Sequence, residues 1–279
     1  RRQRQMCIRV SSDIVSAKTM LPVKTQPTCR QLCLFLSEYA AWLLGCGATC
    51  IRLEKNVNRI AEAFDKHVDM CIMPRHIHLT VSSHDRHISF TAISSIRCKA
   101  ISFDINTRLS RLSWEIADEK IDFTQVQHRF EVITKTPPAN KWLVLFLASA
   151  ANASFCRLFG GDLLAMGIVF VATLAGFYLK QILTENKVDV RIVFIICAFV
   201  SSVLGATDGL FGLGTTPGVA IGTSVLYLVP GIPFLNSFSD MLDRHYVCAF
   251  SRFMDAMILT ACLSIGLCGG MFMMNVDMF

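Results

Sequence analysis

The stretch Gly209–Ser239 decides the fold class, because GLFGLGTTPGVAIGTSVLYLVPGIPFLNSFS carries no charged side chain in 31 residues. A spanning helix needs about 20 mostly apolar residues, so this stretch is long enough to cross a bilayer. Four further segments lack charge in the same part of the chain: Trp142–Cys156, Leu163–Leu179, Ile192–Thr207 and Ala256–Val276. The sequence therefore predicts an α-helical integral membrane protein with about five transmembrane helices. The first segment ends at Arg157 and spans only if that side chain lies at an interface or faces the protein interior.

The long uncharged stretch is interrupted at Val229-Pro230-Gly231-Ile232-Pro233. Proline lacks a backbone donor and clashes with the preceding turn, so a helix breaks there. In a membrane, broken backbone is tolerated where it is buried in protein or lines a water-filled cavity. A new helix N-terminus at the break would present N–H groups to an anion, and Asn236 follows nearby. The alternative reading is an ordinary turn at the membrane edge.

Charge separates two parts of the chain. Residues 31–140 hold 13 Lys/Arg and 12 Asp/Glu, whereas residues 141–279 hold 7 and 8. We expect a basic, disordered tail over 1–29 with no signal-peptide core, a cytosolic α+β domain over 30–138, and a transmembrane helical domain over 139–279. The whole net charge of +6 comes from the first 30 residues, where a basic tail would meet anionic lipid.

The α+β prediction rests on two hydrophobic periods. Leu32, Leu36, Tyr39 and Leu43 recur at helical spacing up to Gly45 and Gly47, and a second amphipathic helix follows. Its apolar positions are Leu53, Val57, Ile60, Ala61 and Phe64. Residues 68–93 alternate as strands around a hairpin turn at Ser83-His84-Asp85-Arg86, and a last helix is expected near Phe123–Val132.

Four histidines cluster in this hairpin, at His76, His78, His84 and His87. Imidazoles bind Zn²⁺, but no cysteine or carboxylate completes a familiar spacing, so we predict solvent-exposed strand histidines, no metal and no cofactor. No phosphate loop or nucleophile elbow occurs, so we do not expect an enzyme or a nucleic-acid-binding protein.

Loop charge predicts the orientation. Lys180, Lys187 and Arg191 are assigned to the loop after the second span, and Arg244 and Arg252 to the connection after the fourth. The loop near Gly209–Pro217 has no positive charge. We therefore expect the N-terminus inside and the C-terminus outside the cytoplasmic (inner) membrane.

Several motifs resemble the threonine/serine exporter family, and its YjjP-like branch in particular. They are Leu44-Gly45-Cys46-Gly47-Ala48, Phe155-Cys156-Arg157-Leu158-Phe159-Gly160-Gly161-Asp162, Thr216-Pro217-Gly218-Val219-Ala220, and Leu228 through Asp240 with its Pro-Gly-x-Pro segment. The resemblance implies a subunit that exports small carboxylates, either succinate-like dicarboxylates or threonine and serine. It also implies a YjjB-type small membrane partner, and we expect an oligomer.

The resemblance makes Pro230, Gly231, Pro233, Asn236 and Asp240 substrate-pathway residues, together with Arg157, Gly160 and Gly161. Asp208 and Asp255 are the candidates for proton coupling, because ionisable groups beside apolar spans are usually functional. Two alternatives stay open: a membrane-anchored regulatory or assembly protein without transport, and a membrane-anchored metal-dependent enzyme.

Overall fold

The computed structural model describes residues 26–83, 87–96, 101–119, 121–211 and 216–275. The chain divides into two compact units. The first holds Arg1–Ala48 and Arg52–Lys135, and the second holds Thr49–Ile51 and Thr136–Phe279. The sequence boundary between them therefore lies beside Pro137 and Pro138. The expected basic tail lies almost wholly outside the described residues.

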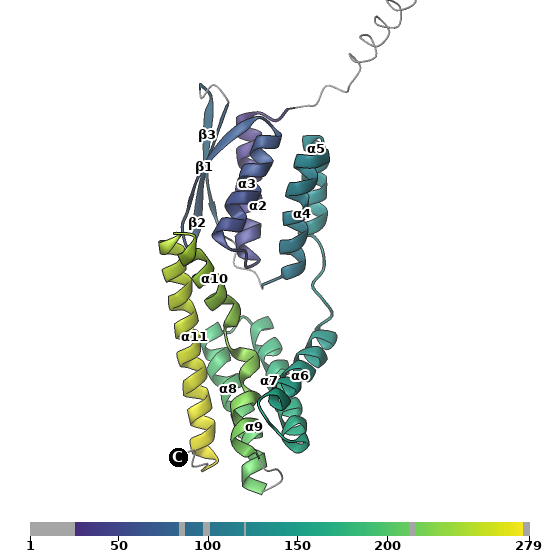
Figure 1. Cartoon of the computed structure of the whole chain (residues 1–279), viewed down its shortest axis with the longest axis vertical. Coiled ribbons are helices and arrows are strands. Elements are labelled where there is room, and N and C mark those ends of the chain that lie inside the picture. Colours follow the sequence, from purple (N-terminus) through teal and green to yellow (C-terminus); the bar gives the residue numbers. More distant parts are fainter. Residues whose placement is uncertain (1–25, 84–86, 97–100, 120, 212–215, 276–279) are drawn as a thin grey trace, which may run out of the picture. The chain divides into compact units, whose positions relative to one another are not determined.

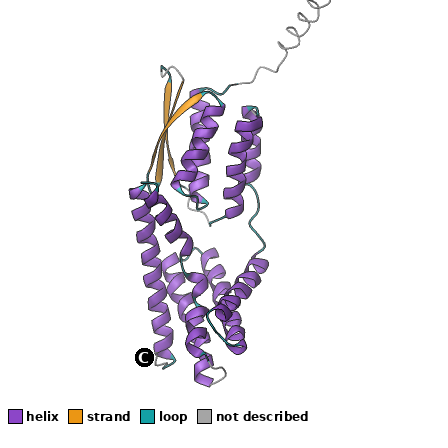
Figure 2. Cartoon of the chain, in the orientation of Figure 1, coloured by secondary structure: helices purple, strands orange, loops and turns teal. Residues whose placement is uncertain are grey.

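The first unit combines helices with one antiparallel sheet of strand order β1-β2-β3 (Figures 1 and 2). The register pairs Val68 of β1 with Val81 of β2, and Val81 with Phe90 of β3. The predicted hairpin is confirmed as the β2–β3 pair, although residues 84–86 of its turn lie outside the described part. The elements are α2 (Cys29–Gly45), α3 (Cys50–Ala63), β1 (Lys66–Ile72), β2 (His76–Ser83), β3 (Ser89–Ser95), α4 (Phe103–Glu119) and α5 (Phe123–Thr134).

Local chemistry explains where α2 begins and ends. Thr28 and Gln31 form a capping box at its start, satisfying N–H groups that the helix itself leaves free. Its last residue is Gly45, and Gly47 follows in the left-handed region at φ +90°. The predicted helix over these residues is confirmed.

The core of this unit contains the apolar positions predicted from periodicity. Leu32, Leu36, Tyr39 and Leu43 of α2 are fully buried, and the predicted apolar positions of α3 join the same cluster. On β2, Ile77, Leu79 and Val81 are buried while His76 and His78 are exposed. Helix α2 packs against β2 and β3, so the alternation along β2 places its apolar face toward the core.

The second unit is a bundle of helices that run up and down in succession (Figure 1). Helix α8 is central, since it packs against α7, α9 and α11. The elements are α6 (Lys141–Leu158), α7 (Leu163–Glu185), α8 (Val190–Phe211), α9 (Pro217–Ser224), the 3₁₀-helix η1 (Leu226–Leu228), α10 (Gly231–Leu242) and α11 (Tyr246–Met273).

Three described helices are long and apolar enough to cross a membrane: α7, α8 and α11. A fourth crossing results if α9–η1 and α10 together make one span, although the pair is bent by 63°. Helix α6 is long enough at 18 residues but is not among these candidate spans. The fold is therefore a mostly helical membrane protein with three or four candidate spans. The five spans predicted from the sequence include α6 as well.

Helices α8 and α11 approach closely through glycines. A Cβ on Gly266 would overlap the carbonyl oxygen of Ile195, and one on Gly270 would overlap the Ser202 hydroxyl. These two glycines stand four residues apart, the small-xxx-small spacing that lets membrane helices touch backbone to backbone. The α8–α11 contact therefore depends on the absence of side chains at both positions.

Candidate functional site

The helix break predicted at Pro230 is confirmed. Helix α9 ends at Ser224 and η1 at Leu228, and α10 begins at Gly231 with Pro230 as its N-cap. Val229 adopts φ −53° and ψ 98°, outside the helical region that a following proline disfavours.

The start of α10 offers fewer hydrogen-bond donors than the sequence suggests. The N–H of Gly231 donates to the Val229 carbonyl at 2.5 Å. Pro233 has no N–H. Two of the first three positions therefore present no donor to a ligand, which makes this N-terminus a weaker anion site than an ordinary helix start.

Buried Asn152 of α6 forms hydrogen bonds with both α7 and α9. Its Nδ2 donates to the Thr223 carbonyl at 2.9 Å and to the Thr173 hydroxyl at 2.6 Å. Thr223 lies in the last turn of α9, and its carbonyl also accepts from the backbone N–H of Val225. One buried amide of α6 therefore holds α7 and α9 together.

A second polar contact lies between α8 and η1. The hydroxyls of Ser201 and Tyr227 are 3.0 Å apart, and a Cβ on Gly176 of α7 would overlap both oxygens. The glycine therefore keeps space for this hydroxyl pair. We use the name polar cluster for Asn152, Thr173, Ser201, Thr223 and Tyr227, which come from α6, α7, α8, α9 and η1.

Lys180 borders the polar cluster, one turn beyond Gly176 on α7. Its ammonium nitrogen lies 5.3 Å from the ring centroid of Phe194, 5.8 Å from that of Phe177 and 6.0 Å from that of Tyr227. The assignment of Lys180 to a loop is wrong, because α7 continues to Glu185. Phe177 lies three residues earlier on the same helical face, and this spacing was the sequence feature that could have placed Lys180 in the helix.

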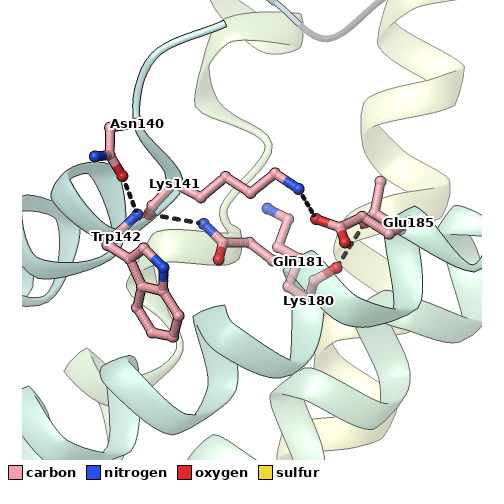
Figure 3. A network of polar contacts seen from close by, with 7 residues as sticks. Asn140, Lys141, Trp142, Lys180, Gln181 and Glu185 are labelled. Carbon is pink, nitrogen blue, oxygen red and sulfur yellow. Dashed lines mark hydrogen bonds and ion pairs between the residues drawn. The ribbon is translucent and has the colours of Figure 1, made fainter.

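The neighbouring end of α7 carries a polar network, shown in Figure 3, in which the Lys180 backbone carbonyl accepts from the Thr184 hydroxyl. Lys141 pairs with Glu185, and Gln181 donates to the Lys141 carbonyl at 3.3 Å. Trp142 and Tyr178 stack with ring centroids 5.8 Å apart. Aromatic rings and charges of this kind gather at membrane–water interfaces, so this end of the bundle has interfacial character.

Arg157, Gly160 and Gly161 form the turn between α6 and α7. Gly160 takes φ +86°, and the N–H groups of Gly160 and Gly161 donate to the carbonyls of Arg157 and Cys156. This is a Schellman motif, which explains both glycines as a helix ending. The exposed Arg157 side chain donates to the Gly161 carbonyl at 3.1 Å. These residues lie at the end of α6 remote from the network of Figure 3.

Asp240 lies fully buried in the last turn of α10. Its carboxylate forms an ion pair with Arg252 at 2.8 Å. The other carboxylate oxygen accepts from the backbone N–H of Cys50 at 2.7 Å, one of the three residues 49–51 that belong to the second unit. Arg252 stands within α11 rather than in the connection before it, so its loop assignment is wrong.

The remaining predicted residues are dispersed. Asp208 is fully buried near the end of α8, Asp255 is exposed on α11, and Asn236 is half-buried on α10. His76, His78 and His87 are exposed, and His84 lies outside the described residues. Among the described residues, no group of three or more His, Cys, Asp or Glu side chains has the geometry to hold a metal ion.

Apolar helices long enough to cross a bilayer, together with a broken helix and polar side chains between the helices, define an integral membrane protein. Residues 34–274 match the family described as "Putative threonine/serine exporter", and the chain belongs to this family. The resemblance stated from the motifs is thereby confirmed.

Three relatives show where the chain stands within the family. It is 29% identical over 238 residues to the "Probable succinate transporter subunit YjjP" of Klebsiella aerogenes, covering 85% of this chain and 90% of the relative. The Escherichia coli K12 protein of the same description is 25% identical, covering 88% and 94%. A "Probable threonine/serine exporter" of Mycobacterium tuberculosis is 22% identical, covering 63% of this chain and 34% of the longer relative. No solved structure matches the chain.

Proposed function

We propose that this chain is one subunit of an exporter of small carboxylate metabolites, either a succinate-like dicarboxylate or threonine and serine. The observation that carries the proposal is the polar cluster beside a broken helix. Polar side chains in a bundle of apolar helices are expensive to bury and are usually kept for function. Solute would pass by alternating access, with no covalent chemistry and no cofactor.

The proposed partner is a small membrane protein of the YjjB type. Two relatives are themselves described as transporter subunits, and the chain matches only 34% of a longer exporter. Both observations support a split system in which a second chain completes the pathway. We propose the inner membrane as the location, with five crossings, a cytosolic N-terminal domain and the C-terminus outside.

The broken helix also supports the substrate-pathway residues Pro230, Gly231, Pro233 and Asn236. Asp240 and Arg157 are retained in the proposal as flanking residues. Asp240 already has a cationic partner in Arg252, so a direct substrate contact there requires that pair to open. Gly160 and Gly161 are also retained in the proposal, because they form the turn that positions Arg157.

The test is efflux of preloaded, labelled succinate and threonine from cells lacking their own exporters. This chain is expressed alone and together with a YjjB-type partner, and membrane insertion is checked for both. We expect efflux only when both chains are present. Efflux with this chain alone would replace the split system by self-association. No efflux of either solute from correctly inserted proteins would overturn the proposal and favour a regulatory or assembly protein.

Proton coupling makes a separate prediction for the two aspartates. Asp208 is fully buried whereas Asp255 is exposed, so Asp208 is the better proton carrier. We expect Asp208→Asn to abolish the dependence of efflux on an imposed pH gradient, and Asp255→Asn to leave it near wild type. Efflux that follows the gradient equally well in both variants would exclude coupling through either residue.

A further inference from the structure

We propose that Lys180 is the cation that binds a carboxylate group of the substrate, with the hydroxyl pair of Ser201 and Tyr227 beside it. The inference rests on the proposed function for the class of ligand. It adds a binding residue that none of the sequence motifs contains.

The position of Lys180 is unfavourable without a ligand. It lies five residues inside the end of α7, on the face that carries Thr173 and Gly176 toward the polar cluster. Taking a cation out of water is costly, and three aromatic rings offset only part of such a cost. Within the described part of the chain, Lys180 forms no ion pair and its ammonium donates no hydrogen bond. A carboxylate would supply both.

The surroundings of Lys180 fit a carboxylate. The Tyr227 ring lies 6.0 Å from the ammonium, while the hydroxyl of the same residue meets Ser201 at 3.0 Å. Because one of these two hydroxyls donates to the other, the pair has one O–H left with which to donate to an anion near the ammonium. Charge-assisted hydrogen bonds of this kind are roughly twice as strong as neutral ones. The nearby carboxylate of Glu185 is already paired with Lys141 (Figure 3).

The simplest competing role is an interfacial lysine that extends toward water. Its ammonium would then join the polar network at the end of α7. It lies instead near three rings contributed by α7, α8 and η1. The two roles differ in one measurable respect, since only the binding role makes carboxylate affinity depend on this charge.

The experiment measures binding of labelled succinate and threonine to the purified full-length chain in detergent. We expect Lys180→Gln to weaken binding of the preferred ligand by about 10- to 100-fold, the effect of losing one charged hydrogen bond. Lys180→Arg should stay within a few-fold of wild type because it keeps the charge. Lys187→Gln is the matched control, since it removes an exposed charge just beyond the same helix. Thermal unfolding verifies that all variants are folded.

Each outcome separates this inference from the proposed function. Wild-type binding that Lys180→Gln leaves unchanged overturns the inference, as does a wild-type protein that binds neither ligand. Binding that depends on Lys180 without efflux in the presence of the partner supports the binding site and overturns the exporter. Full efflux by Lys180→Gln supports the exporter and removes Lys180 from its site.

Discussion

Replacing Asp240 with alanine is expected to destabilise the second unit by about 3–5 kcal/mol, because it leaves Arg252 without its buried counter-charge. The Asp240 side chain is fully buried and that of Arg252 is 23% exposed, so solvent compensates little. Thermal unfolding of the purified chain in detergent measures the loss. Asp243→Ala is the matched control, since it removes an exposed carboxylate three residues later.

The double variant Asp240→Met with Arg252→Met tests whether the pair acts only in stability. Replacing both members of a buried ion pair by apolar residues is often neutral or stabilising. We expect the double variant to recover most of the loss and to remain about 1–3 kcal/mol below wild type, because the buried Cys50 N–H loses its acceptor. If its efflux also returns, Asp240 is structural, whereas stable protein without efflux places Asp240 in the substrate pathway. If Asp240→Ala lowers stability no more than Asp243→Ala does, the buried-pair interpretation is contradicted.

Gly266→Ala is expected to destabilise the bundle by about 1–3 kcal/mol, and Gly266→Leu by more, because each forces α11 away from α8. A Cβ at this position overlaps the Ile195 carbonyl oxygen, and backbone has little freedom to move aside. Gly270→Ala should act in the same direction through Ser202 and the Phe199 carbonyl. Thermal unfolding in detergent again gives the measurement.

Gly269→Ala provides a control, because its expected effect on the stability of the bundle is opposite to that of Gly266→Ala. A Cβ there comes no closer than 3.6 Å to Phe199, an ordinary contact, and the residue is exposed. Alanine is favoured over glycine in a helix interior by about 0.8–1.0 kcal/mol, so this variant should be neutral or more stable. Equal destabilisation by Gly266→Ala and Gly269→Ala would show that close helix packing is not the cause.

Most of the fold could be predicted from the sequence because its signals are local. Leu32, Leu36, Tyr39 and Leu43 lie on one helical face whatever surrounds them, and all four are buried. The alternation around Ile77 and Leu79 likewise identified the strand and its buried face. The break at Pro230 follows from the covalent structure of proline itself.

The candidate site could not be predicted in the same way, because it joins residues far apart in the chain. Asn152, Thr173 and Thr223 are ordinary polar residues in their own segments, and only helix packing brings them within hydrogen-bond distance. The Gly160-Gly161 pair was expected beside a substrate-pathway cation, and its geometry is that of a helix ending. Local spacing does not distinguish these two roles.

The sequence by itself determined the membrane class, the change of character near Pro137, the position of the helix break and the family. These depend on hydrophobicity, charge and backbone chemistry, which each segment carries alone. Tertiary structure decided that Lys180 belongs to a helix beside aromatic rings and that Asp240 has a buried partner in Arg252. A side chain's partners depend on how helices pack, and that packing is set by contacts between distant segments.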